Sequence, residues 1–91
     1  MVRIDTRQTN AFLRTYKKLH NNQKDAVDQA VDDIVLNPMI GEPKTGDLAG
    51  VYVYKFKCVG LFFLLAYEFD PTTRTLLLVG THENFYRDLK H

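Results

Sequence analysis

The sequence predicts an α+β fold in which a two-helix hairpin covers one face of an antiparallel sheet. Between residues 12 and 35 apolar side chains recur at helical spacing, and from residue 51 they follow the alternation of a strand. Asn37-Pro38 separates these two halves, because the residue before a proline disfavours helix. The predicted order is a strand, two antiparallel helices, three further antiparallel strands and a short C-terminal helix.

The first helix is predicted from an apolar stripe of Phe12, Leu13, Tyr16 and Leu19. The second is expected to begin after Asn22 as its N-cap and to end at Asn37-Pro38. Its buried stripe comprises Ala26, Val27, Ala30, Val31, Ile34 and Val35. Helices joined by so short a turn pack as an antiparallel hairpin.

The two helices carry opposite charge: the first is basic and the second is acidic. One interpretation, which we favour, is a pair of solvated faces that attract each other weakly across the hairpin. The other is that the basic helix contacts phosphate.

The strands follow from alternation and turn residues. An edge strand is expected at 2–5, and the second strand at 51–58 ends at a Val59-Gly60 hairpin turn. The segment 61–67 is apolar on both faces, which predicts a central strand covered on both sides. A last strand is expected at 75–79 with Gly80 ending it, followed by a short helix over 81–90.

Composition narrows the class of protein. The 91 residues, 45% of them hydrophobic, predict one domain over 1–91. The single cysteine and the absence of clustered metal ligands predict no disulfide, metal or cofactor. The start of the chain lacks the apolar core of a signal peptide, and the run 59–67 is too short to cross a bilayer, which predicts a cytoplasmic protein without membrane contact. The net charge of +1 counts against extensive nucleic-acid binding.

Alternation of the second strand places Lys55 and Lys57 on one face and the aromatic side chains on the other. The aromatic face is expected under the helices, so the lysines project from the open face. They either keep that face soluble or bind phosphate.

The C-terminal segment offers proton-transfer groups. On a helix His82 and Tyr86 share a face, as do Glu83 and Arg87. Histidine exchanges protons near neutral pH, and tyrosine or glutamate can assist it. By spacing alone, the favoured interpretation is a solvated helix held by Phe85 and Leu89.

Several short motifs, in order along nearly the whole chain, resemble the RelE/ParE toxins of type II toxin–antitoxin systems. They are Leu36-Asn37-Pro38, then the Leu48-Ala49-Gly50-Val51-Tyr52 entry to the second strand, and Val79-Gly80-Thr81-His82 followed by an aromatic residue. The resemblance implies a toxin that is neutralised by a cognate antitoxin. An acidic, amphipathic antitoxin tail would lie against the open sheet face and the basic helix.

The RelE-like members bind the ribosome and cleave mRNA, with the 2′-hydroxyl as the nucleophile. By this resemblance His82, Tyr86 and Glu83 would be catalytic, while Lys55, Lys57 and Arg87 would bind phosphate. These nucleases usually carry an arginine early in the third strand, where this chain has 61–65, all apolar. Only Arg74 or Arg87 could replace it.

That departure keeps two alternatives open. One is a ParE-like toxin that inhibits DNA gyrase without chemistry, and the other is a degenerate toxin that only binds its antitoxin. The predicted function is nonetheless a ribosome-dependent mRNA endonuclease that inhibits translation.

Overall fold

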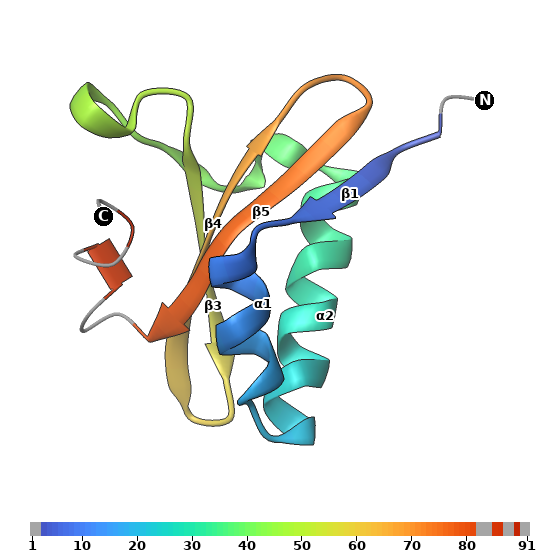
Figure 1. Cartoon of the computed structure of the whole chain (residues 1–91), viewed down its shortest axis with the longest axis vertical. Coiled ribbons are helices and arrows are strands. Elements are labelled where there is room, and N and C mark those ends of the chain that lie inside the picture. The colour runs from blue at the N-terminus through green and yellow to red at the C-terminus, as the bar shows by residue number, and fades with distance from the viewer. Residues whose placement is uncertain (1–2, 82–84, 87–88, 90–91) are drawn as a thin grey trace.

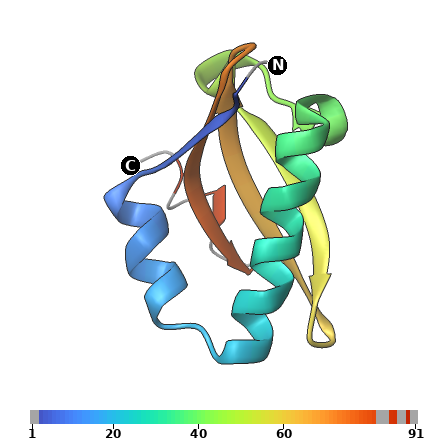
Figure 2. The same cartoon turned by 90° about the vertical axis from the view of Figure 1, so that its right-hand side faces the viewer.

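The computed structural model describes residues 3–81, 85–86 and 89 of the chain (Figure 1). The elements in order are β1 (Asp5–Gln8), α1 (Asn10–Lys17), α2 (Asn21–Leu36), the 3₁₀ turn η1 (Pro38–Ile40), β2 (Glu42–Pro43), the 3₁₀ turn η2 (Gly46–Leu48), β3 (Tyr52–Cys58), β4 (Leu61–Phe69) and β5 (Thr73–Thr81). The α+β class and the helical hairpin on one sheet face are as predicted (Figure 2).

The five strands form one sheet in the order β1-β5-β4-β3-β2. The apolar strand β4 lies at the centre, as its composition predicts, and β3, β4 and β5 are antiparallel neighbours. A two-residue turn joins β3 to β4, with positive φ at both Val59 (51°) and Gly60 (83°). This conformation suits the right-handed twist of a hairpin, although a β-branched residue adopts it at a cost.

The strand bounds differ from the prediction in three places. The N-terminal strand is Asp5–Gln8 and pairs in parallel with β5, whereas the prediction was 2–5, of which residue 2 lies outside the described part. The short strand β2 pairs with the start of β3, at a position where no strand was predicted. Gly80 does not end β5, because it still pairs with Leu64 of β4 and the strand continues to Thr81.

Local hydrogen bonds determine at which residue each helix begins. Helix α2 begins at Asn21 with His20 as its N-cap, so the prediction of Asn22 was wrong. The Gln23 side chain accepts a hydrogen bond from the His20 backbone N–H at 2.8 Å, and this fixes the first turn earlier. Helix α1 is capped by Thr9, whose hydroxyl accepts from the Phe12 N–H at 3.1 Å.

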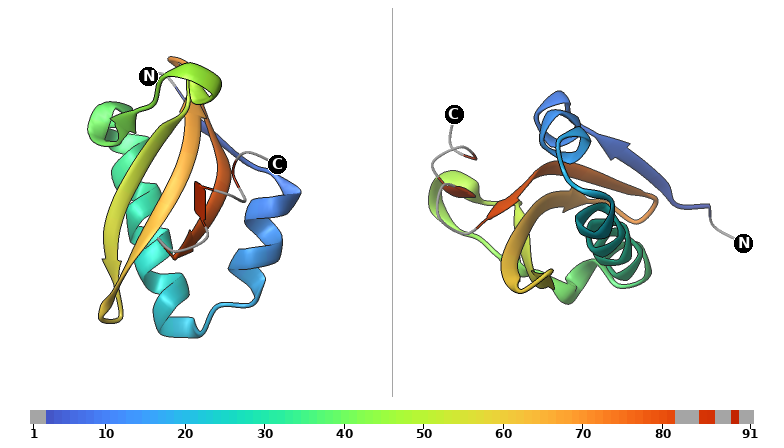
Figure 3. Two further views of the ribbon diagram at one scale, coloured as in Figure 1. Left: turned by 90° about the vertical axis from the view of Figure 1, so that its left-hand side faces the viewer. Right: turned by 90° about the horizontal axis from the view of Figure 1, so that it is seen from below.

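Each face of the sheet has its own buried cluster. On the helix side, residues from both helices pack against Phe63, Leu65 and Tyr67 of β4. On the other side, Val53, Leu64 and Leu78 pack against Phe85 of the C-terminal segment. Figure 3 shows this segment on the opposite side of the sheet from the helices. Burial on both faces explains why residues 63–66 of β4 are all apolar.

Buried Tyr67 joins the central strand to the turn after α2. Its hydroxyl donates to the Pro38 carbonyl at 2.6 Å and accepts from the Gly41 N–H at 2.9 Å. Burial raises the pKa of Tyr67 above its ordinary value, so the donating proton is retained. A Cβ on Gly41 would lie 2.6 Å from this hydroxyl, which is why a glycine stands there.

We predict that Tyr67→Phe lowers the free energy of unfolding by roughly 1–3 kcal/mol, because it leaves two buried backbone groups without partners. Tyr52→Phe is the matched control: its hydroxyl contacts only the Met39 sulfur, at 3.8 Å, among the described residues. Urea denaturation of both variants measures the difference. Equal stability would mean that water replaces the Tyr67 hydroxyl.

Candidate functional site

The face of the sheet away from the helices carries the two strand lysines. We call it the lysine face; on β3 and β4 its side chains are those of Val53, Lys55, Lys57, Phe62, Leu64, Ala66 and Glu68. The expected orientation of the β3 side chains is confirmed, since Tyr54, Phe56 and Cys58 belong to the cluster beneath the helices. The roles of the lysines stay predictions.

Lys55 and Lys57 lie at the hairpin end of this face, and both are exposed. Across the ladder, Phe62 is the Cα partner of Lys57. The Lys55 ammonium lies 4.5 Å from the centroid of the Phe62 ring, a cation–π contact. Neither lysine forms a salt bridge with a carboxylate of the described residues.

Tyr86 reaches the same face from the C-terminal segment. It packs against the Val53 and Leu64 cluster, and its ring meets that of Phe85 edge-on at 5.3 Å. The Lys44 ammonium lies 5.2 Å from the centroid of the Tyr86 ring. A side-chain hydrogen bond with Tyr86, and a further one with Glu42, raise the pKa of Lys44 against the lowering effect of burial.

The predicted site residues share a face, but they do not all meet at one point. Lys44 is held at the start of β3, where its N–H donates to the Val51 carbonyl at 2.9 Å. Lys57 is at the other end of that strand, and five residues of strand span roughly 17 Å. Tyr86 therefore stands near one end of the lysine face and the exposed lysines near the other. His82, Glu83 and Arg87 lie outside the described residues.

Arg74 cannot supply the missing arginine, so that alternative was wrong. Its side chain is 5% exposed and lies on the helix side of β5. It donates to the carbonyls of Asp70 at 2.7 Å and Val35 at 3.3 Å, and stacks on Phe69. The positive charge sits at the C-terminal end of α2, where the helix dipole favours it. Burial and this packing make Arg74 a structural residue.

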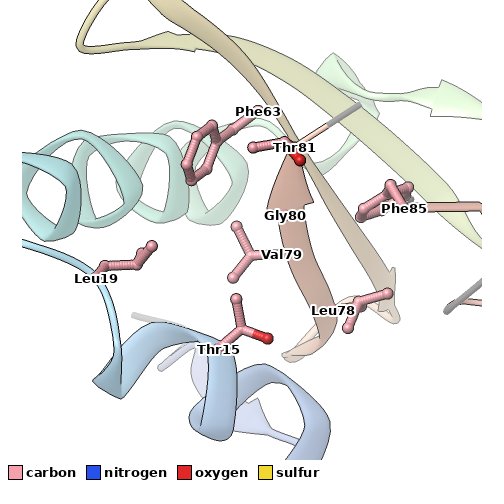
Figure 4. Close-up of a pocket in the computed structure, with 8 residues that line it drawn as sticks. All are labelled: Thr15, Leu19, Phe63, Leu78, Val79, Gly80, Thr81 and Phe85. Carbon is pink, nitrogen blue, oxygen red and sulfur yellow. The ribbon is translucent and has the colours of Figure 1, made fainter. Parts of the chain in front are cut away.

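Two cavities adjoin α1. One, of about 260 Å³, lies at the free edge of β5 and is lined by the end of α1, the last residues of β5, and Phe63 and Phe85 (Figure 4). It exists because β1 pairs with β5 only as far as Leu76. Among the described residues, its polar side chains are those of Thr15 and Thr81.

The second cavity, of about 240 Å³, lies between the helices. At its rim Tyr16 of α1 donates to the Asp28 carboxylate of α2 at 2.7 Å, and this hydrogen bond raises the pKa of Tyr16. The described parts of the oppositely charged helices are linked by this hydrogen bond and by Lys24 over the Tyr16 ring, not by salt bridges.

Over residues 3–81 and the described positions beyond them, no cluster of three or more acidic, histidine or cysteine side chains could hold a metal ion. In the same part of the chain, every helix is too short or too polar to cross a membrane.

Sequence reasoning missed two residues of the lysine face, Phe62 and Lys44. Alternation along β4 from buried Leu64 would have found Phe62. Lys44 could not be found in this way, because its position depends on the pairing of β2 with β3.

We predict that Arg74→Met lowers the free energy of unfolding by roughly 1–3 kcal/mol, because the carbonyls of Val35 at the end of α2 and of Asp70 lose a charged donor. Arg7→Met, on exposed β1, is the control and should change it by about 0.5 kcal/mol or less. Thermal and urea unfolding measure both. An Arg74→Met protein of unchanged stability would contradict the structural role.

Known proteins share this fold. A family model described as "ParE-like toxin of type II bacterial toxin-antitoxin system" matches residues 6–90. None of the curated proteins matches the chain by sequence. Among solved structures, the RelBE2 toxin–antitoxin complex of Mycobacterium tuberculosis contains a chain with 29% identity and a TM-score of 0.75, covering 90% of this chain and 94% of that one.

Two further structures share the fold. The free form of an Escherichia coli RelE toxin mutant has a TM-score of 0.73 at 15% identity, covering 98% of this chain and 90% of that one. The YoeB/ParE toxin of Agrobacterium tumefaciens has a TM-score of 0.68 at 14% identity, covering 87% and 99%. The family model spans nearly the whole chain, which therefore belongs to the ParE-like toxins of type II bacterial toxin–antitoxin systems.

Proposed function

We propose that this toxin inhibits translation as a ribosome-dependent mRNA endonuclease. The observation that carries the proposal is the pair of exposed ammonium groups, Lys55 and Lys57, on the sheet face that the helices leave uncovered. An overall charge of +1 does not preclude such a site, because two cations are concentrated on one face. A tyrosine, Tyr86, reaches the same face.

In the proposed reaction the RNA 2′-hydroxyl attacks the adjacent phosphorus. A base takes the hydroxyl proton, the bond to the 5′-oxygen breaks, and an acid protonates that oxygen. The products are a 2′,3′-cyclic phosphate and a 5′-hydroxyl. We assign proton transfer to His82, Tyr86 and Glu83, and stabilisation of the phosphate charge to Lys55, Lys57 and Arg87.

We predict that Lys55→Ala/Lys57→Ala slows mRNA cleavage on ribosomes by at least about 100-fold, because charged donors to the transition state are removed. Lys17→Ala/Lys18→Ala is the matched control, since it removes the same charge from the exposed end of α1. Newly formed 5′ ends of mRNA and cell growth are followed after induction, with circular dichroism to verify folding. If both double variants cleave like the wild type, the lysine face is not the active centre.

Inhibition of DNA gyrase is the second candidate, and one observation favours it. The position expected to carry an arginine in the third strand lies in an apolar stretch, where Phe62 projects on the lysine face. A non-catalytic toxin would need no phosphate-binding arginine. Measuring translation and plasmid supercoiling in parallel after induction separates the two targets. A chain that affects neither process yet binds its antitoxin tightly would be a degenerate toxin.

The partner we propose is a small antitoxin encoded next to this chain. Two features support a protein partner: none of the described strands lies beside the edge of β5 beyond Leu76, and an apolar cavity adjoins it. The RelBE2 relative was solved as a toxin–antitoxin complex. The basic helix α1 beside this edge suits an acidic, amphipathic tail.

We predict that Lys17→Ala/Lys18→Ala weakens antitoxin binding by roughly 0.2–1 kcal/mol for each lost charge, with a smaller effect at high salt. Calorimetric titration of the purified pair at two salt concentrations measures it. Failure of the tagged toxin to recover any such partner from cells that carry the native locus would count against the assignment.

A further inference from the structure

Phe62 is an exposed aromatic side chain of β4 that lies beside the two lysines of β3 on the lysine face. Alternation along β4 places it on the same side as Leu64 and Ala66, which are 3% and 0% exposed. Phe62 itself is 52% exposed. The neighbours are covered because Phe85 packs on them, and Phe62 is not part of that cluster. The Phe62 ring therefore lies just beyond the part of the face on which Phe85 packs.

The surroundings of the ring are cationic. Lys57 lies directly across the ladder, and the Lys55 ammonium is 4.5 Å from the ring centroid. Lys55 and Lys57 are two residues apart on one strand, so their Cα atoms are separated by roughly 6.7 Å. We refer to these three side chains, Phe62, Lys55 and Lys57, as the Phe62 platform.

An aromatic ring flanked by ammonium groups matches one class of ligand best. An apolar protein surface would leave the two ammonium groups without partners, which is costly. An acidic peptide would pair with the lysines but would not need the ring. A single-stranded nucleic acid uses all three, because its bases stack on aromatic rings while its phosphates contact cations.

We infer that the Phe62 platform binds single-stranded RNA by stacking one base on Phe62 while the adjoining phosphates contact Lys55 and Lys57. The inference deepens the proposed endonuclease function and rests on it, since it states how the substrate is held. Phe62 lies close to the end of β5, because Thr81, the last residue of that strand, pairs with Phe63, the neighbour of Phe62. Stacking there holds an RNA strand beside the point from which the chain continues to residue 82.

The chain contains no tryptophan, so one can be introduced as a specific probe. Phe62→Trp keeps a stacking ring, and the fluorescence of that single tryptophan is quenched when a base stacks on it. Leu61→Trp is the matched control, because Leu61 is 56% exposed yet alternation directs it to the other side of the strand. Phe62→Leu removes the ring and keeps the position apolar.

The experiment titrates the full-length variants with a short oligoribonucleotide and with an abasic strand of the same length, at low ionic strength. We expect quenching of Phe62→Trp by the oligoribonucleotide alone, and little change in Leu61→Trp. By anisotropy, Phe62→Leu should bind the oligoribonucleotide roughly 5- to 150-fold more weakly than the wild type, the effect of losing one stacked base. It should bind the abasic strand as the wild type does.

The outcomes separate this inference from the proposed function. If Phe62→Leu binds both strands like the wild type, or Phe62→Trp is not quenched although RNA binds, stacking is overturned while lysine-dependent mRNA cleavage can still hold. Absence of RNA binding by the wild type also overturns the platform. If Lys55→Ala/Lys57→Ala then proves as toxic as the wild type, the endonuclease proposal fails as well.

Discussion

Side chains along β3 and β4 alternate strictly between the helix side of the sheet and the lysine face. The rest of the structure depends on this alternation. The central strand is covered by helices on one side and by Phe85 on the other, so its side chains are almost all apolar. A slip of one residue between β3 and β4 would bury Lys55 and Lys57 beneath α2 and expose the aromatic side chains. The cost of burying unpaired charge makes that alternative inaccessible. The same register thus provides both the core and the cationic surface.

Polar groups in the core mainly hold the ends of elements. The Tyr67 hydroxyl fixes the turn after α2, and the Arg74 guanidinium donates to the Val35 carbonyl in the last turn of that helix. Both side chains come from central strands and act on the same helix end, so sheet and hairpin are joined where the chain reverses. The lysine face, by contrast, contains few internal polar bonds among the described residues, which leaves its ammonium groups available to ligands.

The sequence was sufficient for the class of fold, the central strand and the direction of Lys55 and Lys57, because alternation and helical spacing are local patterns. It was insufficient where pairing between distant segments of the chain decides the bounds of a strand or the burial of a side chain. The strand β2 forms only because β3 offers an edge, and Gly80 stays in β5 because β4 still pairs with it. For the same reason Arg74 was wrongly kept as a possible replacement for the missing arginine: its burial depends on contacts with Val35, far away in the chain. The proximity of Lys44 to Tyr86 likewise follows from tertiary packing.

One irregularity in β5 has a consequence for how this fold tolerates changes of length. Leu76 pairs with Tyr67 and Leu78 with Ala66, so Leu77 is an extra residue, a β-bulge. The spare Leu77 carbonyl accepts a hydrogen bond of 2.6 Å from Thr9, the residue that caps α1. Loss of Leu77 would leave the strand pairing in register and would remove this hydrogen bond, while the Thr9 backbone N–H could still donate to the Leu76 carbonyl, as it does at 3.0 Å. The extra residue of β5 therefore serves the attachment of α1 and not the pairing of the central strands.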